Sequence, residues 1–273
     1  MRITRVVWGC FAIVTFAAGT AAFADTIHGS SGAAFQAWNS SNLTQNGHPY
    51  WDNPSQDGYG KNVGFFMVNA LTASLPDAPG SVPFWGNSYD SSRGGDDTNG
   101  TADLNFYFQR DEQFSVASLQ LELAGQSNIN AFGWYNIADP SVLHQIFSGP
   151  DSAPDTNTFS PSADYGFYLQ AGNLGTFFTQ SSLNPKGDTS HQHFVVFEQS
   201  AAAGAEVYWI GIEDQSLSQL GSNEGGYGDF NDMLVRITAE PPQTEDVPEP
   251  SAGLLALFGT LFVGGLLYRR RRE

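Results

Sequence analysis

The chain has 273 residues, of which 11 are basic and 28 are acidic, so its formal net charge is −17. Six of the basic residues lie at the two ends, and residues 25–250 hold 27 of the acidic side chains against only 5 basic ones. A region this acidic repels phosphate backbones, which excludes direct nucleic-acid binding.

Residues 1–24 have the pattern of a secretory signal peptide. Arg2 and Arg5 precede an apolar run over 6–18, and Ala22-Phe23-Ala24 follows as a small-residue cleavage site. We therefore expect cleavage between Ala24 and Asp25. Cys10 is the single cysteine of the chain and would be removed with this segment, so the mature protein would contain neither a disulfide nor a cysteine metal ligand.

Residues 25–239 are predicted to form an all-β ectodomain, an antiparallel β-sandwich or jelly roll. Short segments rich in Phe, Tyr, Val and Ile recur between turn residues, and several alternate apolar with polar side chains. The expected strands cover 63–70, 104–109, 116–123, 131–137, 165–170, 175–180, 193–199, 207–212 and 233–237. We treat the region as one folded unit, with two subdomains as the alternative.

One short helix is expected within this region. Asp139 is a suitable N-cap, Pro140 suits the first helical position, and residues 142–147 would follow.

The most distinctive acidic cluster lies near the end of the predicted ectodomain. Glu213 and Asp214 end one expected strand, and Asp229, Asn231 and Asp232 precede the next, across a Gly-rich loop over 221–228. In extended geometry the side chains of Asp229 and Asn231 would point the same way. Oxygen ligands of this kind suit Ca²⁺, which takes six to eight of them. The alternative is a set of turn and cap residues on a solvated edge.

Three weaker patterns each allow both a functional and a structural explanation. One acidic loop resembles half of a calcium loop, through the alternating residues Asp97, Asn99, Thr101 and Asp103, but Asn99-Gly100 alone favours a hairpin turn. His191 and His193 could share one strand face, yet no third zinc ligand is identifiable. The five tryptophans of the predicted ectodomain could stack on sugar rings but more often fill a sandwich core; they are Trp38, Trp51, Trp85, Trp134 and Trp209.

The carboxyl-terminal segment predicts a spacer followed by a membrane anchor. Residues 240–250 are rich in proline and acid, which keeps such a linker extended. The apolar stretch 251–268 is long enough to span a bilayer as a helix, and the basic end 269–273 would hold that side in the cytoplasm.

The linker ends in Val247-Pro248-Glu249-Pro250, directly before the apolar stretch and the arginines. This order resembles the PEP-CTERM sorting signal of Gram-negative bacteria. The resemblance implies an exported protein whose tail is an address read by an exosortase, a membrane protease. It also implies a setting in which exopolysaccharide and biofilm matrix are made.

A second resemblance covers the stretch from Tyr165-Gly166-Phe167-Tyr168 to Asp229-Phe230-Asn231-Asp232, by way of Gly211-Ile212-Glu213-Asp214. It is similar to a bacterial surface-domain family of unknown function, which implies a surface-exposed β-sandwich with calcium at the acidic hairpin. The loop over 215–228 carries only Glu224 as an acid, whereas the family's loops are often more acidic.

Together these features favour a non-enzymatic, exported protein of the cell surface or extracellular matrix, stabilised by calcium, processed by an exosortase and associated with exopolysaccharide or biofilm. The alternative is a lectin-like carbohydrate-binding module. A secreted glycan-active hydrolase is a third possibility, since paired carboxylates cannot be distinguished by spacing among so many acids. The chain contains no G-x-S-x-G, H-E-x-x-H or phosphate-loop motif.

Overall fold

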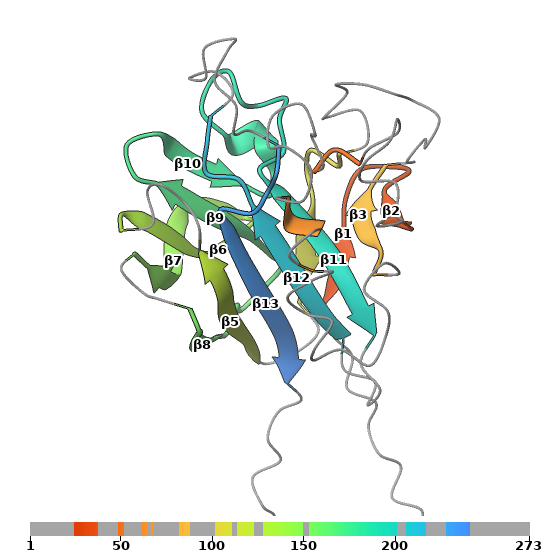
Figure 1. Ribbon diagram of the computed structural model, residues 1–273, viewed down its shortest axis with the longest axis horizontal. Helices are drawn as coiled ribbons and strands as arrows, with labels where there is room; N and C mark the ends of the chain where they lie inside the picture. Colours follow the sequence, from red (N-terminus) through yellow and green to blue (C-terminus); the bar gives the residue numbers. More distant parts are fainter. Residues whose placement is uncertain are drawn as a thin grey trace, which may run out of the picture.

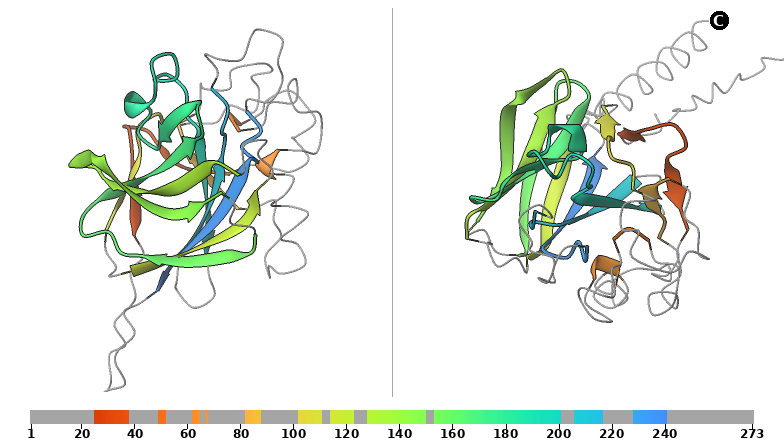
Figure 2. Two further views of the ribbon diagram at one scale, coloured as in Figure 1. Left: turned by 90° about the vertical axis from the view of Figure 1, so that its left-hand side faces the viewer. Right: turned by 90° about the horizontal axis from the view of Figure 1, so that it is seen from above.

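A computed structural model describes residues 25–37, 49–51, 62–64, 67, 82–87, 102–110, 114–122, 128–149, 153–200, 206–216 and 228–240. Across these residues the chain forms two antiparallel sheets that face each other (Figures 1 and 2). The predicted signal peptide, sorting motif, membrane helix and basic end lie outside the described residues. No helix among the described residues is long and apolar enough to cross a membrane.

The first sheet, sheet A, has six strands among the described residues, in the order β1-β4-β9-β6-β7, with β10 also paired to β9. Its strands are β1 (Thr26–His28), β4 (Tyr107–Gln109), β6 (Asn130–Asn136), β7 (Asp139–Ser148), β9 (Tyr165–Ala171) and β10 (Gly175–Phe178). A short 3-10 helix, η3 (Ser181–Leu183), follows β10.

The second sheet, sheet B, has seven strands in the described part of the chain, in the order β2-β3-β11-β12-β13-β5-β8. Its strands are β2 (Ala34–Gln36), β3 (Phe84–Gly86), β5 (Phe114–Glu122), β8 (Asp155–Phe159), β11 (Phe194–Ser200), β12 (Glu206–Ile212) and β13 (Met233–Glu240). The last strand thus ends at Glu240, where the predicted linker begins.

The space between the sheets is filled by an apolar core, which we call the inner core. Met233, Val235 and Ile237 of β13 enter it from sheet B, as the alternation along that strand predicted. Phe167 of β9 lies among rings from both sheets, with ring centroids 5.3 Å from Phe132 and 5.7 Å from Phe159. The predicted all-β, antiparallel architecture is therefore confirmed.

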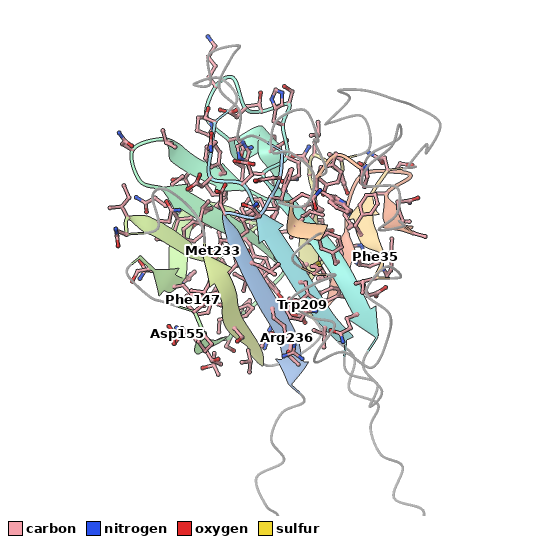
Figure 3. The ribbon with its side chains drawn as sticks, in the orientation of Figure 1. Phe35, Phe147, Asp155, Trp209, Met233 and Arg236 are labelled. Carbon is pink, nitrogen blue, oxygen red and sulfur yellow. The ribbon has the colours of Figure 1, made fainter. Side chains whose placement is uncertain are left out.

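Sheet B is also covered on its outer face, where a second apolar cluster, the outer core, contains Trp51, Phe197, Trp209 and Leu234. Burial on both faces explains why β12 reads as an almost continuous apolar run rather than a strict alternation. Beside this cluster the guanidinium carbon of Arg236 lies 5.9 Å from the centroid of Trp209 (Figure 3).

Asp25, the first residue after the predicted signal peptide, joins the two sheets. Its carboxylate accepts a hydrogen bond of 2.8 Å from Tyr165 of β9, and its carbonyl accepts one of 3.0 Å from Tyr208 of β12. The Asp25 side chain is buried, so the mature chain would begin with a residue built into the sandwich.

Two expectations about secondary structure are wrong. Residues 139–147 form no helix, because β7 pairs with β6 through a hairpin whose register joins Asn136 to Asp139. Val63, Gly64 and Met67 of the expected strand 63–70 are helical, and Val63 and Met67 pack into the outer core. The other eight expected segments each contain an observed strand.

Candidate metal site

The candidate site forms where β12 ends and the chain returns to begin β13. Ile212 makes an isolated parallel bridge with Asn231, although β12 and β13 themselves pair antiparallel. This doubling back requires Phe230 to adopt φ = 51°, a left-handed conformation that is rare outside glycine. Gly211 allows the close approach, because a Cβ there would lie 2.8 Å from the Phe230 carbonyl oxygen. The corner brings residue 213 beside residue 232.

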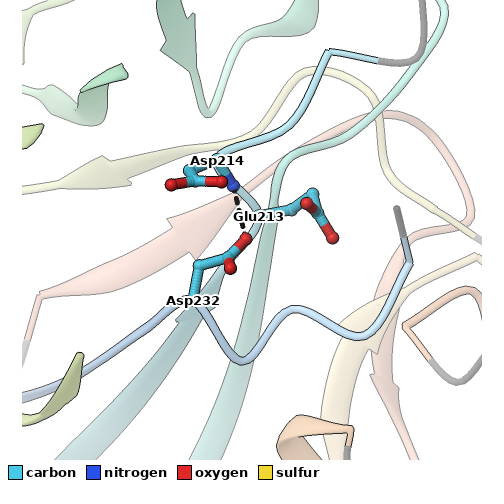
Figure 4. A group of neighbouring side chains, drawn as sticks. All are labelled: Glu213, Asp214 and Asp232. Atoms are coloured by element: carbon cyan, nitrogen blue, oxygen red, sulfur yellow. Dashed lines mark hydrogen bonds between the residues drawn. The ribbon is translucent and has the colours of Figure 1, made fainter. Parts of the chain in front are cut away.

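Three carboxylates gather at this corner. Glu213, Asp214 and Asp232 each offer an oxygen within 4.8 Å of the other two, and all three residues are buried. Figure 4 shows the carboxylates of Glu213 and Asp214 pointing to opposite sides, with Asp232 between them. This is the one such group of potential metal ligands among the residues that the structure describes.

Backbone amides fix two of the three carboxylates. The Glu213 carboxylate accepts hydrogen bonds from the N–H groups of Gln215 at 3.1 Å and Gly228 at 2.8 Å, so it ties together both ends of the long loop. Asp232 Oδ2 accepts the N–H of Asp214 at 2.8 Å. The carboxylates are therefore held in place by the fold.

Burial and mutual repulsion raise the pKa values of all three acids. Burial, reinforced by the charges of Asp232 and Asp229, raises the pKa of Glu213 well above its ordinary value. Burial, followed by the charge of Asp214, raises the pKa of Asp232 from 3.8 to about 8. The pKa of Asp214 is also raised, chiefly by burial. At neutral pH the metal-free cluster therefore retains a proton.

His193 holds the backbone of Glu213 through hydrogen bonds. Its carbonyl accepts the N–H of Glu213 at 2.9 Å, and its Nδ1 donates to the Glu213 carbonyl at 3.1 Å. Its ring stacks on Phe177, with centroids 3.7 Å apart. Burial lowers the pKa of His193 from 6.5 to about 4, so the imidazole is neutral at physiological pH. His193 thus holds the Glu213 backbone, and its ring is not placed as a metal ligand.

The remaining two predicted ligands lie beside the cluster. Asp229 is close enough that its charge contributes to the raised pKa values of Glu213 and Asp232, and its carboxylate faces the N–H of Asn231 at 3.4 Å. The extended geometry expected for 229–231 is wrong, because Phe230 is left-handed. The structure thus brings Glu213, Asp214 and Asp232 together, with Asp229 and Asn231 at the margin.

The weaker sequence patterns have structural explanations where they are described. Asp103 is buried and accepts hydrogen bonds from the Ser30 hydroxyl at 2.9 Å and the Trp85 indole at 2.9 Å; residues 96–101 lie outside the described part. Of the five tryptophans weighed as a sugar platform, Trp51 and Trp209 are buried, Trp85 and Trp134 pack against the inner core, and Trp38 is not described.

One side chain at this site was missed by the sequence reasoning. Asn130, at the start of β6 in sheet A, donates from Nδ2 to Asp214 Oδ2 at 3.1 Å. It lies far from the cluster along the chain, between turn residues and a strand, and only the packing of the two sheets brings it there. No spacing rule could have found it.

Comparisons with known proteins return two similar structures. No family model and no curated protein sequence matches the chain. The structure is similar to the lectin CV2L of Chromobacterium violaceum, solved with alpha-methyl-fucoside, and to the C-terminal domain of the lectin BC2L-C of Burkholderia cenocepacia. Each is 14% identical with a TM-score of 0.27, and the match covers 48% of this chain and 93% and 92%, respectively, of those chains.

Proposed function

We propose that this chain is an exported, non-enzymatic protein of the cell surface or extracellular matrix whose β-sandwich is stabilised by bound Ca²⁺. The observation that carries the proposal is the cluster of Glu213, Asp214 and Asp232, three buried carboxylates within 4.8 Å of one another. Confining several negative charges in a buried site opposes folding, and a dication among them relieves that repulsion.

The donor set favours calcium over the transition metals. The three clustered side chains offer only carboxylate oxygens, and Asp229 and Asn231 would add further oxygens at the margin. Zinc and copper prefer imidazole or thiolate ligands, whereas Ca²⁺ takes hard oxygen ligands in flexible geometry. Magnesium would bind less well, because it requires a small and nearly ideal octahedron.

Export and processing follow from the two ends of the sequence. The signal peptide and the Val247-Pro248-Glu249-Pro250 tail support secretion and recognition by an exosortase, with association to exopolysaccharide or biofilm as the setting. Mass spectrometry of the protein recovered from its host should find Asp25 at the amino terminus and a cut near Pro248–Pro250. Recovery of intact Arg269–Arg272 as the main mature species would contradict this part.

The second candidate is a lectin-like carbohydrate-binding module, the class to which both similar structures belong. A glycan-binding assay on the purified chain, with calcium and with chelator, would distinguish the two candidates. Calcium-dependent retention of a glycan would favour the lectin, and thermal stabilisation by calcium without glycan binding would favour the structural role.

The calcium proposal is tested by thermal unfolding of the full-length chain. For a site with Kd of about 10⁻⁴ M, 10 mM Ca²⁺ is about a hundredfold excess and stabilises the native state by about 2.7 kcal/mol. A protein of this size would then melt about 5–10 °C higher in calcium than in chelator. Magnesium at the same concentration should produce a much smaller rise. Equal melting temperatures in calcium and in chelator would contradict the calcium site and leave the three acids as turn and cap residues.

A further inference from the structure

Asn130 is a buried side chain whose hydrogen-bonding capacity is only half used. It is 1% exposed, and its amide nitrogen donates to Asp214 Oδ2 at 3.1 Å. Among the described residues its amide oxygen, Oδ1, has no hydrogen-bond partner. A buried acceptor without a partner destabilises the folded state, and native proteins seldom leave one in place without a reason.

The backbone fixes where this amide group lies. Asn130 pairs with Ala171 in β9, and its carbonyl accepts the N–H of Gly149 at 2.6 Å. Asn130 and Phe132 are two residues apart on β6, so their side chains lie on the same face of sheet A. Because Phe132 enters the inner core, the Asn130 side chain also faces sheet B. Its amide therefore stands at the end of the sandwich, against the carboxylate of Asp214.

The two atoms of the amide exchange places by a half-turn about the last side-chain bond. In the orientation found, Nδ2 faces Asp214 as a hydrogen-bond donor. A half-turn would put Oδ1 against the same carboxyl group, which is favourable when a cation lies between the two oxygens or when the carboxyl carries the proton. Asn130 can thus serve Asp214 either as a donor without metal or as a fellow ligand with metal.

We propose that Asn130 Oδ1 is a ligand of the calcium ion, alongside Asp214 and Asp232, so that the metal joins sheet A to sheet B. This inference rests on the proposed function and adds a ligand from the opposite sheet. An amide oxygen suits this position, because Ca²⁺ takes amide as well as carboxylate oxygens as ligands.

The test uses the full-length chain with Ca²⁺, and with Tb³⁺ as a luminescent substitute. Calcium affinity is measured by calorimetry, and Tb³⁺ decay rates in H₂O and D₂O count the waters bound to the ion. We expect Asn130→Ala to weaken calcium binding about ten- to a hundredfold and to add about one water to the bound ion. Asn130→Asp keeps an oxygen at the position and should restore the low water count and the affinity.

Asn157→Ala is the matched control. Asn157 of β8 also links the two sheets, since its side chain donates to the Ile146 carbonyl of β7 at 3.0 Å, and its contact lies outside the acidic cluster. Its loss should lower stability while leaving calcium affinity and the water count unchanged.

The possible results distinguish a failure of the Asn130 ligand from a failure of the calcium site itself. Absence of calcium binding by the unmodified chain would overturn both. Binding by the unmodified chain with equal affinity and equal water count in Asn130→Ala would overturn only the role of Asn130. If Asn130→Ala fails to fold, Asn130→Asp decides: calcium binding at least as tight as in the unmodified chain, with the same water count, supports ligation. Loss of binding in the folded Asp variant contradicts it.

Discussion

Asp232 is the carboxylate at the centre of the candidate metal site. It lies between Glu213 and Asp214, and its Oδ2 accepts the N–H of Asp214. Its pKa of about 8 arises chiefly from burial and then from the charge of Asp214. Burial and the neighbouring charges disfavour the ionised form of Asp232. A cation bound beside it would favour the ionised form.

We therefore expect Asp232→Asn to abolish the response to calcium. The amide keeps an acceptor for the Asp214 N–H but removes one negative ligand, so at pH 8 the metal-free variant should melt no lower than the unmodified chain. Its melting temperature should differ by less than about 2 °C between calcium and chelator, against the 5–10 °C expected without the substitution. Asp139→Asn, at an exposed hairpin, is the control and should keep the full calcium response.

For single residues, the sequence predicts spatial neighbours where one connection between adjacent strands brings them together. Glu213, Asp214 and Asp232 could be grouped because β12 and β13 are adjacent in sequence and pair with each other. The geometry of 229–231 could not be predicted, because the left-handed Phe230 is fixed by its packing, with its ring 5.5 Å from that of Tyr50. Asn130 depends on the packing of one sheet against the other, which no local pattern encodes.

The corner between β12 and β13 is the element that builds the site, and Gly211 is its most constrained residue. A methyl group there would lie 2.7 Å from Val63 Cγ2 and 2.8 Å from the Phe230 carbonyl oxygen. Gly211→Ala must therefore push the returning chain away from β12, which would separate residue 213 from residue 232.

We expect Gly211→Ala to destabilise the protein by about 1–3 kcal/mol through overpacking and to weaken calcium binding by at least about tenfold. Thermal unfolding in chelator measures the first effect, and a calcium titration of the folded variant measures the second. A variant that is destabilised but binds calcium as tightly as the unmodified chain would show that the corner does not position the ligands.

Among the elements, the longer apolar strands and the short, aromatic β4 and β10 were predictable, whereas β1, β2, β3, β7 and β8 were not. The segments around β5, β9, β11, β12 and β13 carry enough β-branched and aromatic residues to be recognised. β7 was mistaken for a helix because Asp139 and Pro140 suit a helix start, yet pairing with β6 outweighs that local preference. β1, β2 and β3 have three residues each, and their pairing with distant strands is their main support.

For the whole molecule, Asp232 and His193 make opposite contributions to the free energy of unfolding as the pH changes. The pKa of Asp232 is raised from 3.8 to about 8, so its contribution is present below pH 4 and is lost as the pH rises toward 8. The pKa of His193 is lowered from 6.5 to about 4, so its contribution is present above pH 6.5 and is lost as the pH falls toward 4. Of these two contributions, only that of Asp232 changes between pH 6.5 and 8, and it lowers the free energy of unfolding as the pH rises.

Without calcium the protein should therefore become less stable as the pH rises from 6.5 to 8. With saturating calcium this trend should flatten or reverse, because the metal binds the deprotonated carboxylates. Chemical denaturation at several pH values, in chelator and in calcium, measures both curves. Metal-free stability that rises across this window would show that the cluster is not protonated in the folded protein.

Besides the Asn157–Ile146 hydrogen bond, polar contacts at both ends of β12 join the two sheets. Asp25 connects Tyr165 to Tyr208, and Asn130 reaches Asp214 at the other end of β12. Tyr208 and Ile212 are four residues apart on that strand, a separation of about 13 Å at ~3.3 Å per residue. Asp25 and the Asn130–Asp214 contact thus connect the two sheets near opposite ends of β12.

The central claim is that calcium replaces a proton among Glu213, Asp214 and Asp232, and calorimetry tests it most directly. Calcium is titrated into the metal-free, full-length chain at pH 7 in two buffers with different heats of protonation. We predict binding of one ion per chain, with Kd of about 10⁻⁴ to 10⁻³ M, and release of about one proton per ion. The absence of binding at millimolar calcium, or binding without proton release, would contradict the claim.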